Sequence, residues 1–237
     1  MTKPMLIGIL LGSALALTPI QSNGALLLSG NTIDLPGTTA ILQPELASSV
    51  VHDEAINDYV APGGNDIFRV GVTLQNRVSR SDTDGNLIFA PRIISFFNNT
   101  SGNFLIDRAV ISGFADFKLD VNYRTDGLGD KGPNSASRSA DGNQLSFDFL
   151  SPLVISNLFE NPQQDSYFLS IYSNATAFAN TGSMSIFGRH LGYPDEVFEF
   201  NFTGIAVPID MPVHVPEPAL IAFFFTCFAS LVVFKRR

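Results

Sequence analysis

Hydrophobic and polar residues alternate with a period of two along most of the chain between its two ends. Successive side chains of a strand point to opposite faces, so this alternation predicts strands with one core-facing and one solvent-facing side. Two further runs, 87–97 and 167–172, are apolar on both faces and predict strands nearer the middle of the core. The clearest alternating segments are 68–74, 117–123, 147–149 and 198–203.

Clusters of Gly, Asn, Asp, Pro and Ser separate these runs and predict turns. About eight to ten half-buried strands joined in this way predict an all-β domain, an antiparallel β-sandwich with jelly-roll-like order. A closed barrel is the competing architecture. Residues 45–59 are the segment for which we expect a short helix. The longest stretch expected to be irregular is 126–143, for which a plain surface loop is favoured over a binding loop.

The N-terminal segment has the order of parts found in a secretory signal peptide. Lys3 supplies a positive start, and an apolar run follows over 5–17. Small residues at Ser22 and Gly24 suit the signal peptidase, so we predict a signal peptide over 1–24 and cleavage before Ala25. Cleavage after Ala25 is the near alternative, and a buried N-terminal element is the competing interpretation. The apolar run is too short and wrongly flanked for a stable membrane span.

The C-terminal segment, 215–237, also has three parts. The motif Pro-Glu-Pro at 216–218 precedes an uncharged run over 219–234, and a basic cluster at 235–237 closes the chain. A helix over that run reaches roughly 24 Å, against a hydrocarbon core of about 30 Å. Snorkelling basic side chains cover part of the difference, and they prefer the cytoplasmic side. We therefore predict one transmembrane helix over 219–234 and a separate β-sandwich domain over 25–214.

This tail resembles the PEP-CTERM sorting signal of Gram-negative bacteria, and the resemblance covers only about the last 23 residues. It implies processing by an exosortase-type enzyme after removal of the signal peptide by signal peptidase. It also implies inner-membrane anchoring before processing, and then a secreted or cell-surface protein of a biofilm or exopolysaccharide matrix. A plain tail anchor is the alternative. The residues that carry the resemblance are the sorting motif Pro216, Glu217 and Pro218 and the basic cluster Lys235, Arg236 and Arg237.

The net charge of the predicted domain disfavours some classes of binding partner. Residues 25–214 hold 21 acidic and 10 basic residues, a net charge of 10 − 21 = −11. Such an acidic body argues against binding nucleic acid or anionic membrane by charge. The one cysteine, Cys227, lies in the predicted membrane run, so the domain has no disulfide framework.

Alternating oxygen side chains make Asp82, Asp84 and Asn86 the best metal candidates, with calcium as the ion. An EF-hand loop would need glycine and glutamate where Leu87 and Ile93 stand, so that interpretation fails. A hairpin turn explains the same residues and is favoured over a calcium site. A weaker second set of candidates is Asp126, Asp130 and Asp141.

Nothing in the sequence has the spacing of a known catalytic motif. The histidines His52, His190 and His214 belong to no H-E-x-x-H pattern, and no G-x-S-x-G elbow is present. Glu196 and Glu199 are three apart on a predicted strand and so face opposite sides, which suits a glycosidase poorly. We therefore expect a protein that is not an enzyme and needs no cofactor.

The favoured function is a structural or adhesive component of an exopolysaccharide matrix. A glycan-binding β-sandwich module, with or without calcium, is the second hypothesis, and a secreted hydrolase is the third. Glycan sites stack sugar rings on exposed aromatic side chains, and the chain has no Trp. The candidates for that role are Tyr59, Tyr123, Tyr167, Tyr172 and Tyr193.

Overall fold

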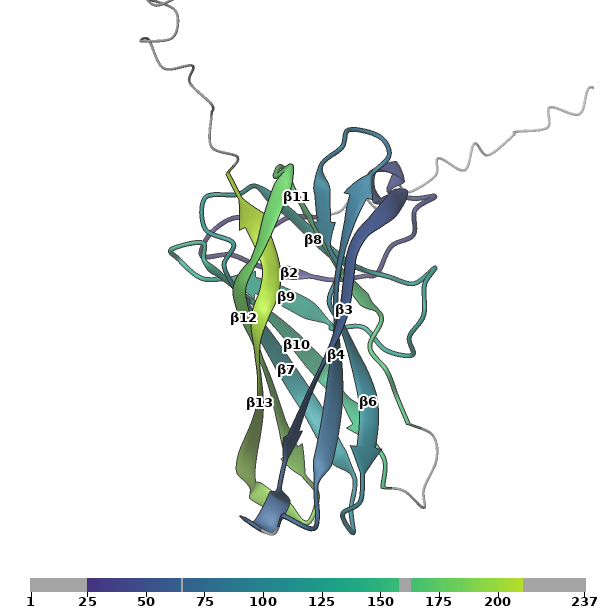
Figure 1. The fold of residues 1–237 in the computed structure, drawn as a ribbon, viewed down its shortest axis with the longest axis vertical. Coiled ribbons are helices and arrows are strands. Elements are labelled where there is room, and N and C mark those ends of the chain that lie inside the picture. The colour runs from purple at the N-terminus through teal and green to yellow at the C-terminus, as the bar shows by residue number, and fades with distance from the viewer. Residues whose placement is uncertain (1–24, 65, 158–162, 211–237) are drawn as a thin grey trace, which may run out of the picture.

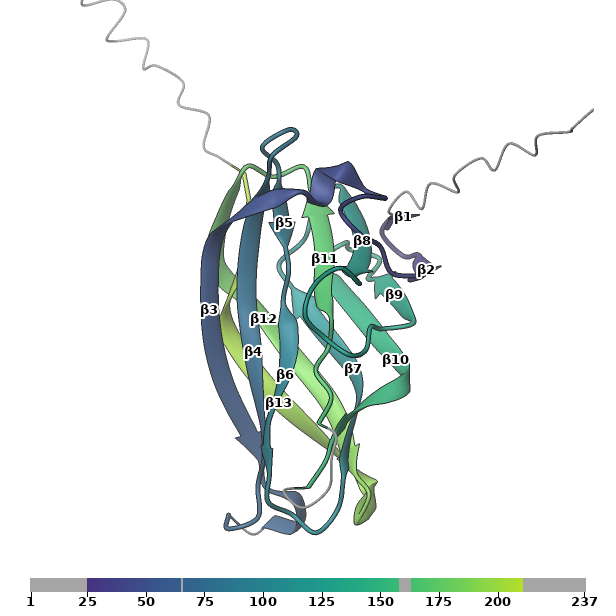
Figure 2. The ribbon, with the colours of Figure 1, turned by 90° about the vertical axis from the view of Figure 1, so that its right-hand side faces the viewer.

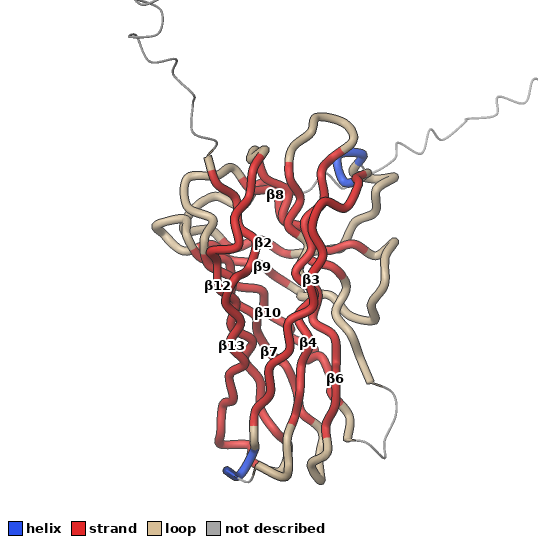
Figure 3. The backbone as a smooth tube through the Cα atoms, viewed as in Figure 1, coloured by secondary structure: helices blue, strands red, loops and turns tan. Residues whose placement is uncertain are grey.

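The computed structural model describes residues 25–64, 66–157 and 163–210, and nearly all of its regular structure is strand (Figure 3). The predicted signal peptide, 1–24, and the predicted sorting tail, 215–237, lie outside the described residues. No helix in the described part is long and apolar enough to cross a membrane. Among residues 25–64, 66–157 and 163–210, the helical segments are two short 3-10 turns, η1 (Pro44–Leu46) and η2 (Pro62–Gly64).

The described residues form two sheets, and all pairs between named strands are antiparallel (Figure 1). The seven-stranded sheet has the order β1 (Ala25–Leu26), β8 (Leu119–Arg124), β11 (Phe168–Ser173), β5 (Leu87–Phe89), β4 (Val70–Ser81), β3 (Ser48–Val60), and β6 (Arg92–Asn98) also pairs with β4. The six-stranded sheet has the order β13 (Tyr193–Ile209), β12 (Ala177–His190), β7 (Phe104–Ser112), β10 (Gln144–Ile155), β9 (Ser135–Arg138), β2 (Thr32–Asp34).

One hydrophobic core lies between the inner faces of the two sheets and takes residues from both. In β10, Leu145, Phe147 and Phe149 are buried, while the residues between them are more exposed, as the period of two requires. Aromatic rings meet edge-on in this core; Phe104 and Phe200, for example, have centroids 5.5 Å apart. The predicted all-β, antiparallel architecture is therefore confirmed, and its arrangement is sandwich-like.

Three local expectations need correction. Residues 45–59 are not helical, because η1 covers only Pro44–Leu46 and the rest belongs to strand β3. The core-facing residues Ile56 and Val60 of β3 are four positions apart, a spacing that fits both a helix and a strand. The stretch 126–143 contains strand β9. The run 87–97 is two strands, β5 and β6, interrupted at Pro91, which has no backbone N–H to donate.

The two ends of the elongated domain differ. Strand β1 begins and strand β13 ends at the same end of the molecule, which we call the tail end (Figure 1, Figure 2). The opposite end, which we call the distal end, is formed by the β3–β4 connection with η2 and by the β12–β13 turn. Backbone and side-chain hydrogen bonds between Arg69 and Asn99 tie the β3–β4 and β6–β7 connections together there.

Candidate functional site

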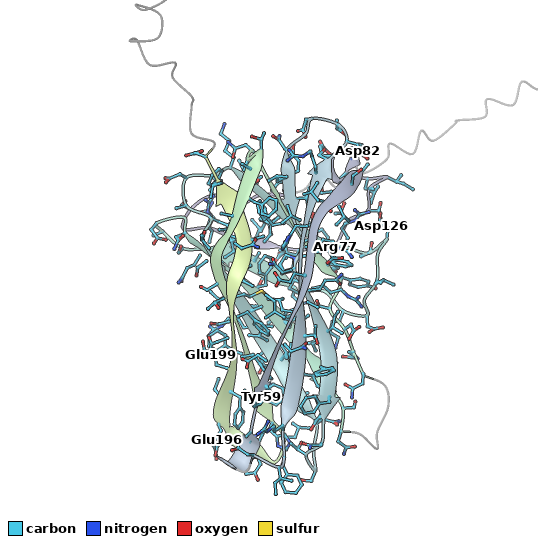
Figure 4. The ribbon with its side chains drawn as sticks, viewed as in Figure 1. Tyr59, Arg77, Asp82, Asp126, Glu196 and Glu199 are labelled. Atoms are coloured by element: carbon cyan, nitrogen blue, oxygen red, sulfur yellow. The ribbon has the colours of Figure 1, made fainter. Side chains whose placement is uncertain are left out.

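The predicted calcium residues lie in the tight loop between β4 and β5, at the tail end (Figure 4). The Asp84 carboxylate accepts hydrogen bonds from the Asn86 backbone N–H at 3.1 Å, from the Asn86 side-chain amide at 2.8 Å and from the Tyr172 hydroxyl. Burial raises the pKa of Asp84, but these hydrogen bonds outweigh it and lower the pKa below its ordinary value. Gly85 has the left-handed φ of 77° that a tight turn needs. The favoured hairpin turn is confirmed.

No group of three or more His, Cys, Asp or Glu side chains is placed to hold a metal ion in the part of the chain that the structure describes. The carboxylates of the second set also accept hydrogen bonds from the protein. A cation at either set stays a prediction from the sequence. Asp126, Asp130 and Asp141 accept hydrogen bonds from the Arg124 guanidinium, the Asp165 backbone N–H and the Ser139 hydroxyl, respectively.

His190 is fully buried in a chain of hydrogen bonds at the distal end. The Gly192 backbone N–H donates to its Nδ1 at 3.0 Å, so the proton of the neutral ring is on Nε2. That Nε2 lies 2.6 Å from the Thr100 hydroxyl oxygen, which in turn lies 2.6 Å from the Asn98 Oδ1. Burial lowers the pKa of His190, so the neutral form is favoured. The side chain holds loops together and has no exposed surface from which to act on a substrate.

The other predicted reactive residues do not converge with it. His52 is half-buried on β3, with its Nε2 3.8 Å from a Glu54 carboxylate oxygen and its ring centroid 5.5 Å from that of Phe178. His214 and Cys227 lie outside the described residues. Glu196 and Glu199 are both exposed on β13, and strand alternation directs them to opposite faces (Figure 4).

The tyrosines divide into two groups. Tyr123 and Tyr167 stack on each other with centroids 5.6 Å apart and an interplanar angle of 15°, and Tyr172 binds Asp84. Tyr59 and Tyr193 are 52% and 41% exposed. Both lie toward the distal end, Tyr59 near the end of β3 and Tyr193 at the start of β13.

Tyr59 belongs to a cluster of aromatic side chains on the outer face of the seven-stranded sheet. Tyr59, Gly71 and Phe97 are cross-strand partners on β3, β4 and β6. The Phe97 ring lies over Gly71, which has no side chain to obstruct it, and meets the Phe96 ring with centroids 5.2 Å apart. The Arg69 guanidinium lies 4.4 Å from the Tyr59 ring centroid. We call Tyr59, Arg69, Phe96 and Phe97 the aromatic patch; Phe96 is 57% exposed.

Next to the aromatic patch, on the same face and toward the tail end, lie polar side chains of β3 and β4. The Thr73 hydroxyl donates to the Asn57 Oδ1 at 2.6 Å, and the Gln75 amide donates to the Asp53 carboxylate at 2.9 Å. Arg77 forms an ion pair with Asp53 at 2.7 Å. We call Asp53, Asn57, Thr73 and Gln75 the polar strip. Aromatic rings beside amides, hydroxyls and carboxylates offer both stacking and hydrogen bonds to a ligand.

The outer face of the six-stranded sheet has a different chemistry. Serine side chains from β7, β9, β10 and β12 lie across its middle, and we call Ser112, Ser137, Ser146, Ser183 and Ser185 the hydroxyl face. They line a shallow depression of about 650 Å³, which is open to solvent. One cross-strand row of this face reads Asn201, Ser185, Val110, Ser146, Ser137, Thr32.

Two arginines adjoin this depression, and they differ in their partners. Arg108 is exposed, lies 4.8 Å from the Phe187 ring centroid and forms no ion pair with any other described residue. Arg138 is buried, and burial lowers its pKa. It ties the first strands to the rest of the sheet by donating to the carbonyl oxygens of Leu27, Phe114, Phe117 and Gly142.

Sequence reasoning missed the hydroxyl face. Its residues come from four strands, of which β9 was expected to be loop and β7 and β12 were not recognised. The available signal was serine at every second position, as in Ser135 and Ser137 or Ser183 and Ser185. That spacing puts both hydroxyls of each pair on one face of a strand.

Neither sheet face is explained by likeness to a known protein. No protein-family model matches the chain, and no curated protein and no solved structure matches it. The chemistry of the two sheet faces and the two ends of the sequence are therefore the features from which function can be inferred.

Proposed function

We propose that this protein is an exported, non-catalytic component of an extracellular matrix, which it joins by binding polysaccharide. The observation that carries the proposal is the hydroxyl face, a broad polar surface on one side of the domain. Serine hydroxyls both donate and accept hydrogen bonds, so they complement the hydroxyl groups of a sugar chain. A calcium-assisted glycan site at Asp82, Asp84 and Asn86 is less favoured, because Asp84 already has protein and backbone partners.

Export and sorting form the second part of the proposal. We propose that the chain has an N-terminal signal peptide, which signal peptidase removes, and a PEP-CTERM-like tail with a membrane helix, which an exosortase-type enzyme processes. Pro216 follows Ile209, the last residue of β13, by seven positions. A chain spans at most about 3.6 Å per residue, so a processing site at Pro216 would be at most about 25 Å from Ile209. The tail end would then face the inner membrane before processing, and the distal end would point away.

The sandwich-like fold is also proposed to be jelly-roll-like in its connections. Support comes from pairs of strands that are distant in the sequence, since β1 pairs with β8 and β2 pairs with β9. Such non-local pairs place the first strands of the domain against its middle.

Co-sedimentation tests the binding. The protein purified from its producing host is mixed with the insoluble extracellular polysaccharide extracted from the same culture. We expect the protein in the pellet, and we expect the double variant Ser146→Glu, Ser185→Glu to bind more weakly. Ser29→Glu, in the exposed turn after β1, is the matched control and should bind normally. A protein that stays in the supernatant would contradict the proposal.

A further inference from the structure

The two outer faces of the domain suit a sugar chain in different ways. We propose that the aromatic patch with its polar strip is a second polysaccharide-binding surface, so that one molecule cross-links two polysaccharide chains. This inference rests on the proposed function, because it assumes that the hydroxyl face binds the first chain.

Geometry separates the two surfaces. The aromatic patch lies on the outer face of the seven-stranded sheet, and the hydroxyl face lies on the outer face of the six-stranded sheet. Both sheets and the core between the sheets separate the two surfaces (Figure 1). The surfaces therefore point in opposite directions. One short stretch of polysaccharide cannot contact both surfaces, whereas two chains can be held at once.

The chemistry of the patch indicates which ligand would occupy it. Phe96 and Tyr59 keep more than half of their surface in solvent, although aromatic side chains usually bury most of theirs. The apolar C–H face of a pyranose ring stacks on such rings. The bonds within the polar strip use the Asn57 Oδ1, the Thr73 hydroxyl proton and the Gln75 amide nitrogen. The Asn57 amide N–H, the Thr73 oxygen and the Gln75 amide oxygen are the groups that would bind the sugar hydroxyls. The net charge of −11 over residues 25–214 disfavours a polyanion. The occupant is therefore an uncharged segment of polysaccharide.

Position also favours this role. Tyr59 of the aromatic patch lies toward the distal end (Figure 4), whereas β13 ends with Ile209 at the tail end (Figure 1). A protein held by its tail end would present the patch away from its attachment point. The β3–β4 connection at the distal end also exposes Ile67 and Phe68, which are 74% and 48% exposed.

A bead-bridging assay tests cross-linking. The total extracellular polysaccharide of the producing culture is coupled to two sets of beads with different colours. The unchanged protein should join beads of both colours into aggregates. At a large excess of protein over polysaccharide the aggregates should decrease, because each polysaccharide chain is then occupied by separate protein molecules. Two double variants each remove one surface. The first, with Tyr59→Ser and Phe96→Ser, removes the aromatic patch, and the second, with Ser146→Glu and Ser185→Glu, removes the hydroxyl face. Each should still bind single beads, yet reduce mixed aggregates about tenfold or more, because bridging needs both surfaces.

Leu150→Ser, on a strand residue that is 82% exposed, is the matched control for the aromatic change and should bridge normally. Binding of beads without any bridging by the unchanged protein would overturn the inference and leave the proposed function intact. Failure to bind the beads at all would overturn both. Light scattering of the protein alone should show a monomer. A dimer that Tyr59→Ser, Phe96→Ser abolishes would overturn the inference, because the patch would then bind a second copy of the chain.

Discussion

Asp120 shows how one carboxyl group can set the pH dependence of stability. It is half-buried on β8, its Oδ1 has no hydrogen-bond partner among the described residues, and burial raises its pKa to about 6. The nearby Glu45 charge raises the pKa further, while a hydrogen bond with Gln43 lowers it. The ordinary value is 3.8. The folded protein therefore binds the Asp120 proton more tightly than the unfolded chain does. The resulting contribution to the free energy of unfolding is complete below about pH 3.8 and is lost as the pH rises through about 6.

We predict that Asp120→Asn stabilises the protein at pH 7.5 by about 1–2 kcal/mol and has a smaller effect at pH 4. A shift of this size corresponds to about 3 kcal/mol for a fully buried group, and partial exposure reduces it. Urea unfolding of both proteins at the two pH values measures the difference. A difference that does not change with pH would contradict the account.

His190 should make the free energy of unfolding increase with pH, which is opposite to the effect of Asp120. Its folded-state pKa lies below the ordinary 6.5, so the unfolded chain takes up the proton first as the pH falls. Unfolding free energy should therefore decrease below about pH 6.5, and the decrease should be smaller in His190→Gln. Titration of the His190 ring by NMR is the direct check. A midpoint at or above 6.5 would show that the Gly192 and Thr100 contacts do not hold the neutral ring.

At the scale of single elements, strand β12 depends on glycine. A methyl group at Gly182 would lie 2.8 Å from the Ser112 carbonyl oxygen and 3.0 Å from that of Ile205. Backbone must move to make room, and overpacking of this kind costs about 1–3 kcal/mol. Gly182→Ala should lower the unfolding free energy by that amount. Ser183→Ala, at the next, exposed position, should change it by less than about 0.5 kcal/mol. Equal effects of the two changes would contradict the register of β12.

Sequence reasoning succeeded with elements whose two faces differ strongly in polarity. The alternation over 147–149 and 198–203 lies within β10 and β13. It failed where local spacing was ambiguous, as in β3, and where small residues weakened the contrast, as in β12. Gly182 and Gly188 occupy core-facing positions of β12, so its apolar period is interrupted twice.

The candidate surfaces were harder to predict than the strands. The hairpin at 82–86 was recognisable because its residues are adjacent in the sequence and each favours a turn. The aromatic patch and the hydroxyl face each join strands that are distant in sequence, and the pairing that brings them together depends on the whole core. Tyr59 was a candidate, whereas Phe96 was hidden in a run that looked entirely apolar.

At the scale of the whole molecule, the structure also bears on processing. Cleavage before Ala25 would keep the pair between Ala25 and Val121, with which β1 joins β8. Cleavage after Ala25 would remove one of the two residues of β1. The first position therefore leaves the described fold complete, and we predict it as the start of the mature protein.

The most direct test of the account is the intact mass of the protein recovered from fractions of its own host. We predict that the mature protein is found outside the cell, begins at Ala25 and lacks residues 219–237. Recovery in the inner-membrane fraction with residues 219–237 still attached would contradict sorting, and the matrix role would lose its main support.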